Sequence, residues 1–182
     1  MRIIPAALLA IFLCSLTTFA FADDDEAANT KFTLNTNAFL DTGPMPVLYT
    51  CDGKNISPQL DWVNVPAKTQ ALAIVLKDPQ AKNGTFYHWV VYNIPTSVTT
   101  LPEDSSKLPA GVGIAKNSDN KAAYTGPCPP KGSSHTYTFD LYALNSKLDV
   151  PAGADGKDVE KLIVKHMIEK AEITGVYSRW LK

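Results

Sequence analysis

Cysteine and histidine are scarce in this chain, with three residues of each among 182. So few cysteines exclude a scaffold held together by many disulfides. The cysteines also lack close-spaced partners, and the histidines do not follow the usual zinc spacings, so the sequence predicts no metal site. We therefore expect a fold stabilised by its own hydrophobic core, without a metal or another cofactor. A chain of this length can bury such a core.

A strong charge of one sign is missing as well. Charged residues make up 19% of the chain and the formal net charge is −1. This balance argues against a basic surface for nucleic acids, so we expect no nucleic-acid partner. The pattern Gly-x-Ser-x-Gly, which marks the nucleophile of many serine hydrolases, is absent from the sequence.

No apolar run in the chain is long enough to favour a membrane span. The longest, residues 6–21, follows the basic Arg2. It overlaps Ala20-Phe-Ala22, which precedes an acidic run. This arrangement predicts a secretory signal peptide over residues 1–22, cleaved after Ala22, and a periplasmic or secreted protein. We expect a flexible N-terminal segment over 23–31 and a single domain over 32–182.

Cys14 lies inside the predicted signal peptide and does not indicate a lipoprotein, because Leu13 stands where a small residue would be expected. Cys51 and Cys128 remain in the mature chain. An oxidising compartment favours a disulfide between them. Closing that long loop would stabilise the fold by about 4–4.5 kcal/mol through chain entropy. Two free buried thiols are the alternative.

The stretch from Tyr124 to Leu144 combines a rigid loop with a strand. Its first half contains three prolines and two glycines and cannot be helical. Its second half alternates, with His135, Tyr137, Phe139 and Leu141 on one face and Thr136, Thr138, Asp140 and Tyr142 on the other. That period predicts a half-buried β-strand with His135 at its mouth.

Two further strands are predicted to carry polar residues at their ends. The apolar run 71–76 ends at Asp78-Pro79 and is too short and too apolar for anything but a central strand or a buried helical turn; the Asp-Pro step favours the strand. Residues 86–95 form a second strand with His88 at its start, on the same face as Val90, Tyr92 and Ile94. One carboxylate and two histidines therefore stand at strand ends, where they can converge.

The rest of the chain predicts short strands and one late helix. We expect short strands at 32–34 and 47–49, mostly loop over 97–123, and a strand over 171–177. Val159, Leu162, Ile163, His166 and Met167 have helical spacing and predict one amphipathic helix of about 12 residues, with His166 packed on its apolar face. This pattern is typical of a mainly β fold, an antiparallel β-sandwich with a few short helices.

Three motifs in order give the chain a specific resemblance. Asp78-Pro-x-Ala, then His88-Trp-Val-Val-x-Asn-Ile-Pro, then Tyr124-x-Gly-Pro-x-Pro-Pro-x-Gly-x-x-His-x-Tyr are similar to the phosphatidylethanolamine-binding protein family and its bacterial Raf-kinase-inhibitor-like branch. The resemblance runs from Phe32 to the C-terminus and implies the same β-sandwich. It also implies a small pocket for phosphate-like and phospholipid head groups, formed by Asp78, His88, Tyr124, Gly126, Pro130, His135 and Tyr137.

The chain departs from the family pattern at three positions near this pocket. Gln80 replaces the usual second acid and Lys82 the usual second proline, while Cys128 replaces what is often a small residue. We expect a less negative pocket with Lys82 at its rim. Backbone amides of Gly126, Cys128 and Gly132 are candidates for an anion-binding nest beside the histidines.

Three functions remain open at this point. The residues favour a periplasmic binding protein for a small phosphorylated or phospholipid-derived ligand, which would require at least one protonated histidine. A secreted inhibitor of a kinase, a protease or a host target is the alternative. A hydrolase using an Asp-His pair is disfavoured, so we expect no enzyme and no catalytic residues. Nothing in the sequence indicates an oligomeric state.

Overall fold

The computed structural model describes residues 30–104, 106 and 108–180. The predicted signal peptide, its cleavage site and Cys14 lie outside these residues, as does most of the predicted flexible segment. The described elements are β1 (Thr33–Asn35), β2 (Gly43–Pro44), the 3-10 helix η1 (Val47–Tyr49), β3 (Leu60–Val63), β4 (Ala71–Asp78), β5 (Phe86–Ile94), β6 (Thr100–Leu101), β7 (Gly113–Ile114), β8 (Ser133–Leu144), α1 (Gly156–His166) and β9 (Met167–Arg179).

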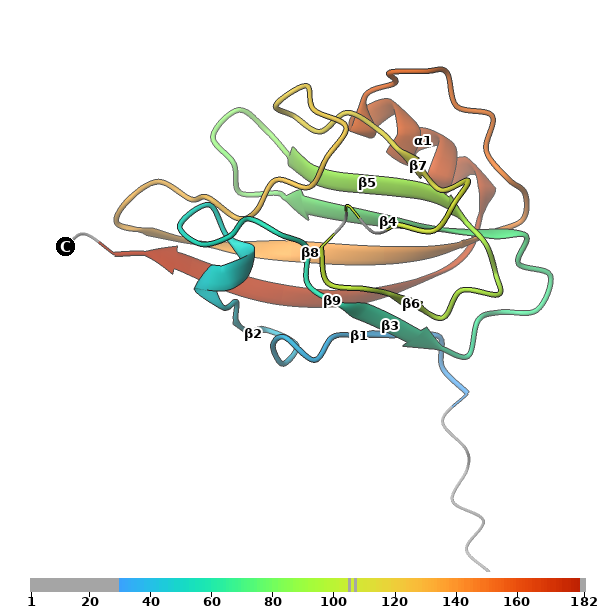
Figure 1. The fold of residues 1–182 in the computed structure, drawn as a ribbon, viewed down its shortest axis with the longest axis horizontal. Helices are drawn as coiled ribbons and strands as arrows, with labels where there is room; N and C mark the ends of the chain where they lie inside the picture. The colour runs from blue at the N-terminus through green and yellow to red at the C-terminus, as the bar shows by residue number, and fades with distance from the viewer. Residues whose placement is uncertain (1–29, 105, 107, 181–182) are drawn as a thin grey trace, which may run out of the picture.

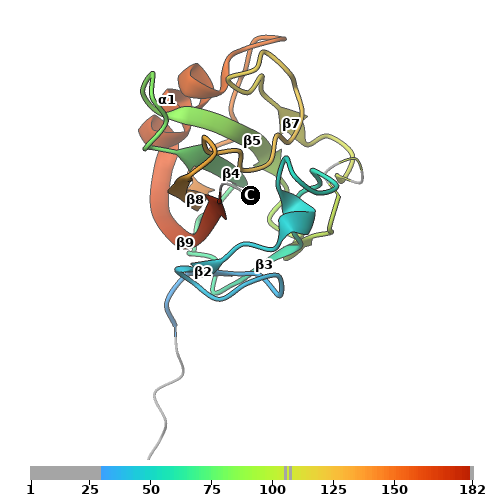
Figure 2. The same cartoon turned by 90° about the vertical axis from the view of Figure 1, so that its left-hand side faces the viewer.

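These strands form two sheets, as the sequence predicts. The larger has the order β2-β9-β8-β4-β5-β7 and the smaller the order β1-β3-β6. Figures 1 and 2 show the small sheet lying across one face of the large, curved sheet, with α1 on the opposite face. All strand pairs are antiparallel except the two-residue pair of β2 with β9. The predicted mainly β sandwich is confirmed.

Strand β4 runs through the centre of the large sheet and is buried on both faces. Every residue of β4 is buried except the half-buried Lys77. Leu72, Ile74 and Leu76 face the small sheet and join the main core. Ala73 and Val75 face the other way, toward a second core under α1. The uninterrupted apolar run of the sequence follows from this double burial.

Helix α1 has close to the predicted length, but Met167, predicted on its apolar face, begins β9 and is 41% exposed. The helix spans 11 residues, with Val159 and Ile163 buried against the sheet. It ends because Met167 takes an extended backbone and continues directly into β9, which is longer at both ends than the predicted strand 171–177. His166 is only half-buried, and its Nδ1 lies 3.1 Å from the Ser146 hydroxyl.

The polar face predicted for β8 is covered rather than exposed. Asp140 is fully buried beneath the α1 layer. Its carboxylate lies 2.9 Å from Lys77 Nζ and 2.8 Å from Lys170 Nζ, and Lys77 also contacts Glu160 of α1 at 2.6 Å. Hydrogen bonds from the two lysines outweigh the effect of burial and hold the pKa of Asp140 below its usual value. We call Lys77, Asp140, Glu160, Lys170 and Glu172 the ionic cluster.

One local prediction needs correction. Residues 47–49 form the 3-10 helix η1 and not a strand, because the Tyr49 and Thr50 amides donate to the Pro46 and Val47 carbonyls and turn the chain back. This turn brings Cys51 to the Pro-rich loop of residues 125–132. The Cys51 amide donates there to the Pro127 carbonyl. Residues 97–123 are mostly loop, as predicted; the two-residue strands β6 and β7 within this stretch pair with β3 and β5.

Candidate functional site

Asp78 and His135 meet because β4 and β8 are antiparallel neighbours. Asp78 is the last residue of β4, and the pairing of Lys77 with Thr138 sets the start of β8 beside it. His135 Nδ1 lies 2.7 Å from Asp78 Oδ2, and the Asp78 side chain is 5% exposed. Because a carboxylate only accepts, Nδ1 of His135 carries the proton and donates it. This hydrogen bond fixes the orientation of the imidazole ring.

His88 reaches the same place through a β-bulge. Trp89 pairs with Leu76 and Tyr87 with Lys77, so His88 is an extra residue on β5. A bulge re-aims the side chain it carries. The prediction that His88 shares a face with Val90 is therefore wrong: Val90 packs toward α1, whereas His88 packs edge-on against Tyr137 at 5.3 Å between ring centroids.

The proton on His88 is also placed by its partner. His88 Nδ1 lies 2.7 Å from the Thr125 carbonyl oxygen, which only accepts, so Nδ1–H is the donor. Burial lowers the pKa of His88, although the hydrogen bond to Thr125 and the charges of Asp78 and Asp119 act in the opposite direction. His88 is thus neutral at pH 7, and its Nε2 is a hydrogen-bond acceptor.

Both imidazoles line one cavity of about 390 Å³. Four of the predicted site residues surround it, namely Asp78, His88, Pro130 and His135. The residues that complete its lining are Ala81, Lys82, Phe86, Asp119, Thr125 and Cys128. The sequence predicted Lys82 at the rim, but it did not identify Phe86, Asp119 or Thr125. Asp119 lies in the long connection before the motif, where no periodicity reveals its position, and Thr125 is an unspecified position of the motif itself.

Tyr124 and Gly126 are not among the residues that line this cavity; they attach the Pro-rich loop to η1 and to the segment that follows it. The Tyr124 hydroxyl donates to the Tyr49 carbonyl at 2.8 Å, and its ring packs on Trp89. The Gly126 amide donates to Asn55 Oδ1 at 2.6 Å. A side chain at Gly126 would collide with the backbone of Tyr49 and Thr50, so glycine is required there.

Tyr137 lies behind the histidines rather than in the cavity wall. It is fully buried, and among the described residues its hydroxyl has no hydrogen-bond partner of good geometry. Burial raises the pKa of Tyr137, so the phenol stays protonated. The ring contacts both imidazoles, with centroid distances of 5.3 Å to His88 and 6.4 Å to His135. Its role in the geometry is to separate and support the two rings.

Two of the three backbone amides predicted for an anion-binding nest, those of Gly126 and Gly132, have partners within the protein. The Gly126 amide is taken by Asn55, and the Gly132 amide donates to the Arg179 carbonyl at 2.5 Å. These two amides therefore hold the loop in place.

The charges around the cavity are mixed. Gln80, in place of the usual acid, does not line it; its amide oxygen accepts from the Thr136 amide at 2.6 Å beside His135. Asp119 supplies a second carboxylate instead. The lining therefore keeps two acidic residues, although we expected the loss of the usual second acid to make the pocket less negative. With neutral imidazoles the lining has the negative charges of Asp78 and Asp119 and the positive charge of Lys82.

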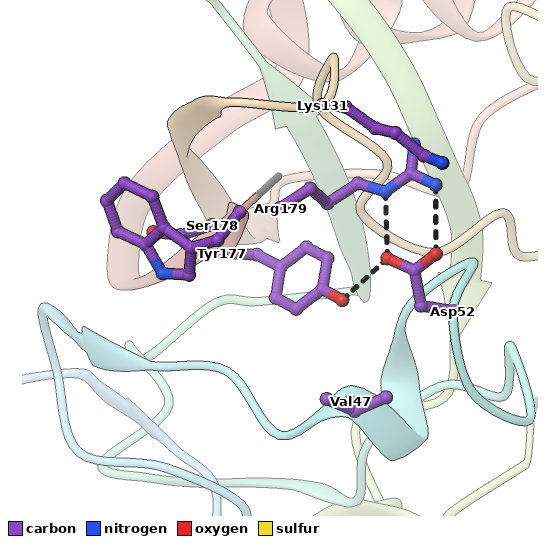
Figure 3. A pocket seen from close by; sticks show the side chains of 7 residues that line it. Val47, Asp52, Lys131, Tyr177, Ser178 and Arg179 are labelled. Carbon is purple, nitrogen blue, oxygen red and sulfur yellow. Dashed lines mark hydrogen bonds and ion pairs between the residues drawn. The ribbon is translucent and has the colours of Figure 1, made fainter. Parts of the chain in front are cut away.

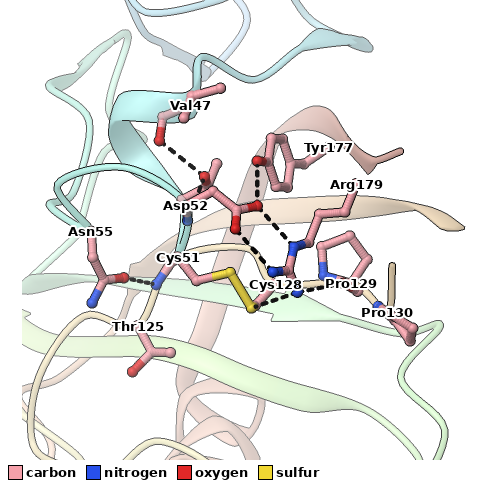
Figure 4. The surroundings of a disulfide bond; sticks show 12 residues. Val47, Cys51, Asp52, Asn55, Thr125, Cys128, Pro129, Pro130, Tyr177 and Arg179 are labelled. Carbon is pink, nitrogen blue, oxygen red and sulfur yellow. Dashed lines mark hydrogen bonds and ion pairs between the residues drawn. A yellow bond between two sulfur atoms is a disulfide. The ribbon is translucent and has the colours of Figure 1, made fainter. Parts of the chain in front are cut away.

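The predicted Cys51–Cys128 disulfide is present and joins the segment after η1 to the Pro-rich loop (Figure 4). Arg179 lies beside it. The guanidinium binds both carboxylate oxygens of Asp52 at 2.8 and 2.9 Å and donates through Nη1 to the Pro129 carbonyl at 3.2 Å. Hydrogen bonds from Tyr177 and Arg179 hold the pKa of Asp52 below its usual value.

A second cavity, of about 700 Å³, adjoins the Asp52–Arg179 pair (Figure 3). Val47, Lys131 and the exposed Trp180 are among its lining residues, and neither pocket histidine is. Among the described residues, no group of three His, Cys, Asp or Glu side chains is arranged to bind a metal ion. The helices in the described part of the chain include none with the length and apolarity of a membrane span.

Comparisons with known proteins agree with this architecture. The family model described as phosphatidylethanolamine-binding protein matches residues 35–178. A UPF0098 protein of Methanothermobacter thermautotrophicus is 43% identical over 149 residues, covering 80% of this chain and 98% of that relative.

Two crystal structures are similar in both fold and sequence. Escherichia coli YbcL, described as a new member of the mammalian PEBP family, has a TM-score of 0.78 and 34% identity, covering 83% of this chain and 99% of that one. The PEBP homologue CT736 of Chlamydia trachomatis has a TM-score of 0.74 and 30% identity, covering 82% and 99%. Homologues in this family are generally binding proteins without enzymatic activity. The chain belongs to the phosphatidylethanolamine-binding protein family.

Proposed function

We propose that the cavity between Asp78, His88 and His135 binds a phosphate-type head group that carries its own amine, with phosphoethanolamine as the simplest example. One observation carries this proposal: the Nδ1–H of each imidazole donates to a fixed acceptor within the protein. Nε2 is therefore the atom that each ring has left for a ligand. The protein would be a periplasmic or secreted binding protein, in keeping with its disulfide.

The two histidines have different roles in this proposal. His88 is neutral because of burial, so its Nε2 accepts a hydrogen bond and suits the ammonium of the ligand. His135 donates to the phosphate when it is protonated, and that cation is ion-paired with Asp78. Lys82 supplies a further cation for the phosphate, and Asp119 a carboxylate for the ammonium. A mixed lining of this kind suits a zwitterion better than inorganic phosphate.

The test is a calorimetric titration of the protein with phosphoethanolamine and, separately, with inorganic phosphate. Phosphoethanolamine should bind more tightly. His135→Gln should lower the affinity for both ligands by about tenfold or more, the scale of a lost charge-assisted hydrogen bond. His88→Gln should mainly abolish the preference for phosphoethanolamine.

The chain offers a matched control. His166, the third histidine, contacts Ser146 and Asn145 and lies outside the cavity, so His166→Gln should bind as the parent does. Melting curves of all three variants establish that each is folded. Equal affinities in the parent, His88→Gln and His135→Gln would overturn the proposal.

A further inference from the structure

The covalent bond that shapes the pocket is accessible from solvent. Cys51 and Cys128 are both exposed residues, whereas the neighbouring Pro127 and Pro129 are buried. Exposed disulfides are the ones that exchange readily with thiols, while buried structural ones resist reduction. The same Cys128 also lines the cavity that contains Asp78, His88 and His135. One reducible bond therefore forms part of the pocket wall.

The loop tied down by this bond supplies several parts of the pocket within a few residues. The Thr125 carbonyl orients His88, and Cys128 and Pro130 belong to the lining. Apart from the disulfide, the loop is held to the segment after η1 by single hydrogen bonds, such as the Cys51 amide to the Pro127 carbonyl and the Gly126 amide to Asn55. Breaking the disulfide leaves the loop with these hydrogen bonds and with those that join it to His88 and Arg179, all of them weaker than a covalent bond.

We propose that the Cys51–Cys128 disulfide is a redox switch of the pocket: exchange with a protein dithiol of the Cys-x-x-Cys type loosens the loop of residues 125–132 and weakens ligand binding. This inference rests on the proposed function of the cavity.

Arg179 determines which sulfur is attacked. Its Nη1 lies 3.5 Å from Cys128 Sγ, as Figure 4 shows, and a guanidinium beside a sulfur stabilises the thiolate. Cys128 is therefore the better leaving group, and the incoming thiolate attacks Cys51 Sγ. A mixed disulfide forms at Cys51, and the electron pair of the broken S–S bond leaves on Cys128, which takes up a proton. The second thiol of the partner then displaces Cys51, so the partner becomes oxidised and this protein gains two thiols.

The switch is tested by titrating phosphoethanolamine into the oxidised protein and into protein reduced with dithiothreitol, with circular dichroism to follow the fold. Reduction should weaken binding by about tenfold and leave the sheet intact. The variant Cys51→Ser/Cys128→Ser should bind weakly with and without reductant. Unchanged affinity on reduction, or global unfolding, would overturn the switch, since the bond would then be irrelevant to the pocket or purely structural.

A second readout does not depend on the ligand. The imidazole NMR signals of His88 should shift on reduction because Thr125 moves, while those of His166 should stay in place. A shifted His88 signal in a protein that binds no phosphoethanolamine in either state would refute the proposed function but keep the redox coupling; an unshifted signal would refute the coupling.

The site of attack can be trapped with a Cys-x-x-Cys protein whose second cysteine is replaced by serine. Peptide mass analysis should find the mixed disulfide on Cys51, and Arg179→Gln should slow its formation. Capture on Cys128 would contradict the role given to Arg179.

Discussion

At the scale of single residues, His88 shows how a small backbone irregularity creates a site. The bulge in β5 turns His88 toward Tyr137 and His135, while its neighbours keep the alternation of the strand. Burial then keeps the ring neutral by lowering its pKa. His88 therefore lines the cavity but lowers the stability of the fold in acid, because a buried neutral imidazole takes up a proton more readily once the protein unfolds.

This property predicts a pH dependence of stability. The pKa of His88 is lowered in the folded state from its ordinary value of 6.5, so the unfolded chain binds more protons between 6.5 and the lower folded value. The free energy of unfolding should fall as the pH drops below about 6.5, by at most about 1.4 kcal/mol per pH unit. Urea denaturation at several pH values measures this dependence. The free energy of unfolding should change less steeply with pH in His88→Gln than in the parent. His166→Gln is the control and should keep the parent slope; identical slopes in all three proteins would argue against a buried neutral His88.

At the scale of elements, the docking of α1 depends on charge as well as on apolar packing. Lys77 lies between the carboxylates of Asp140 in β8 and Glu160 in α1, and the hydroxyl of Tyr87 donates to Glu160 at 2.6 Å. The ionic cluster thus connects the centre of the large sheet with the helix that covers it. Alternation in the sequence indicates only that Asp140 points away from the main core.

Removing Lys77 should therefore destabilise the protein strongly. Lys77→Met leaves Glu160 without a lysine partner and Asp140 with Lys170 alone, in a largely buried place, and we expect the free energy of unfolding to fall by about 2–4 kcal/mol in denaturant titrations. Adding Glu160→Gln should recover part of this loss, because it removes one of the two charges.

The matched comparison for Lys77 is Lys161, which pairs with Asp158 on the outer surface of α1, where both side chains are about two-thirds exposed. Lys161→Met should change stability by less than about 0.5 kcal/mol. Equal effects of the two lysine substitutions would show that the ionic cluster contributes no more than a surface pair.

At the scale of the whole molecule, the disulfide constrains the chain over a sequence separation of 77 residues. That loop contains β3, β4, β5, β6 and β7, and so includes strands of both sheets. Replacing both cysteines by alanine should lower the free energy of unfolding by about 4 kcal/mol, mainly because the unfolded chain gains freedom. Denaturation midpoints, with circular dichroism to confirm the same native sheet, measure this. A loss below about 1 kcal/mol would mean that the reduced, unfolded chain remains compact.

The sequence predicts the large pieces of this structure and misses what depends on contacts between distant segments. The strands around Asp78 and His135 and the helix around Val159 follow from periodicity, and the three motifs identify the family. The bulge at His88 cannot be read from the sequence, because it is defined by the register with β4. Asp119 enters the pocket for the same reason, through a connection without periodicity. Tyr124 and Gly126 match the motif, but their contacts with Tyr49 and Asn55 show that they hold the loop.

The short outer strands of the large sheet have a consequence for how the molecule meets its own copies. β2 pairs with β9 only at Gly175 and Val176, so among the described residues no strand covers the outer edge of β9 from Met167 to Ile173. An open edge of this kind is a template for another chain to add to the sheet, and charged side chains are the usual protection. Glu169, Lys170 and Glu172 stand along this stretch and are exposed. Lys170 therefore serves twice, as the partner of the buried Asp140 and as a guard against aggregation through the open edge of the sheet.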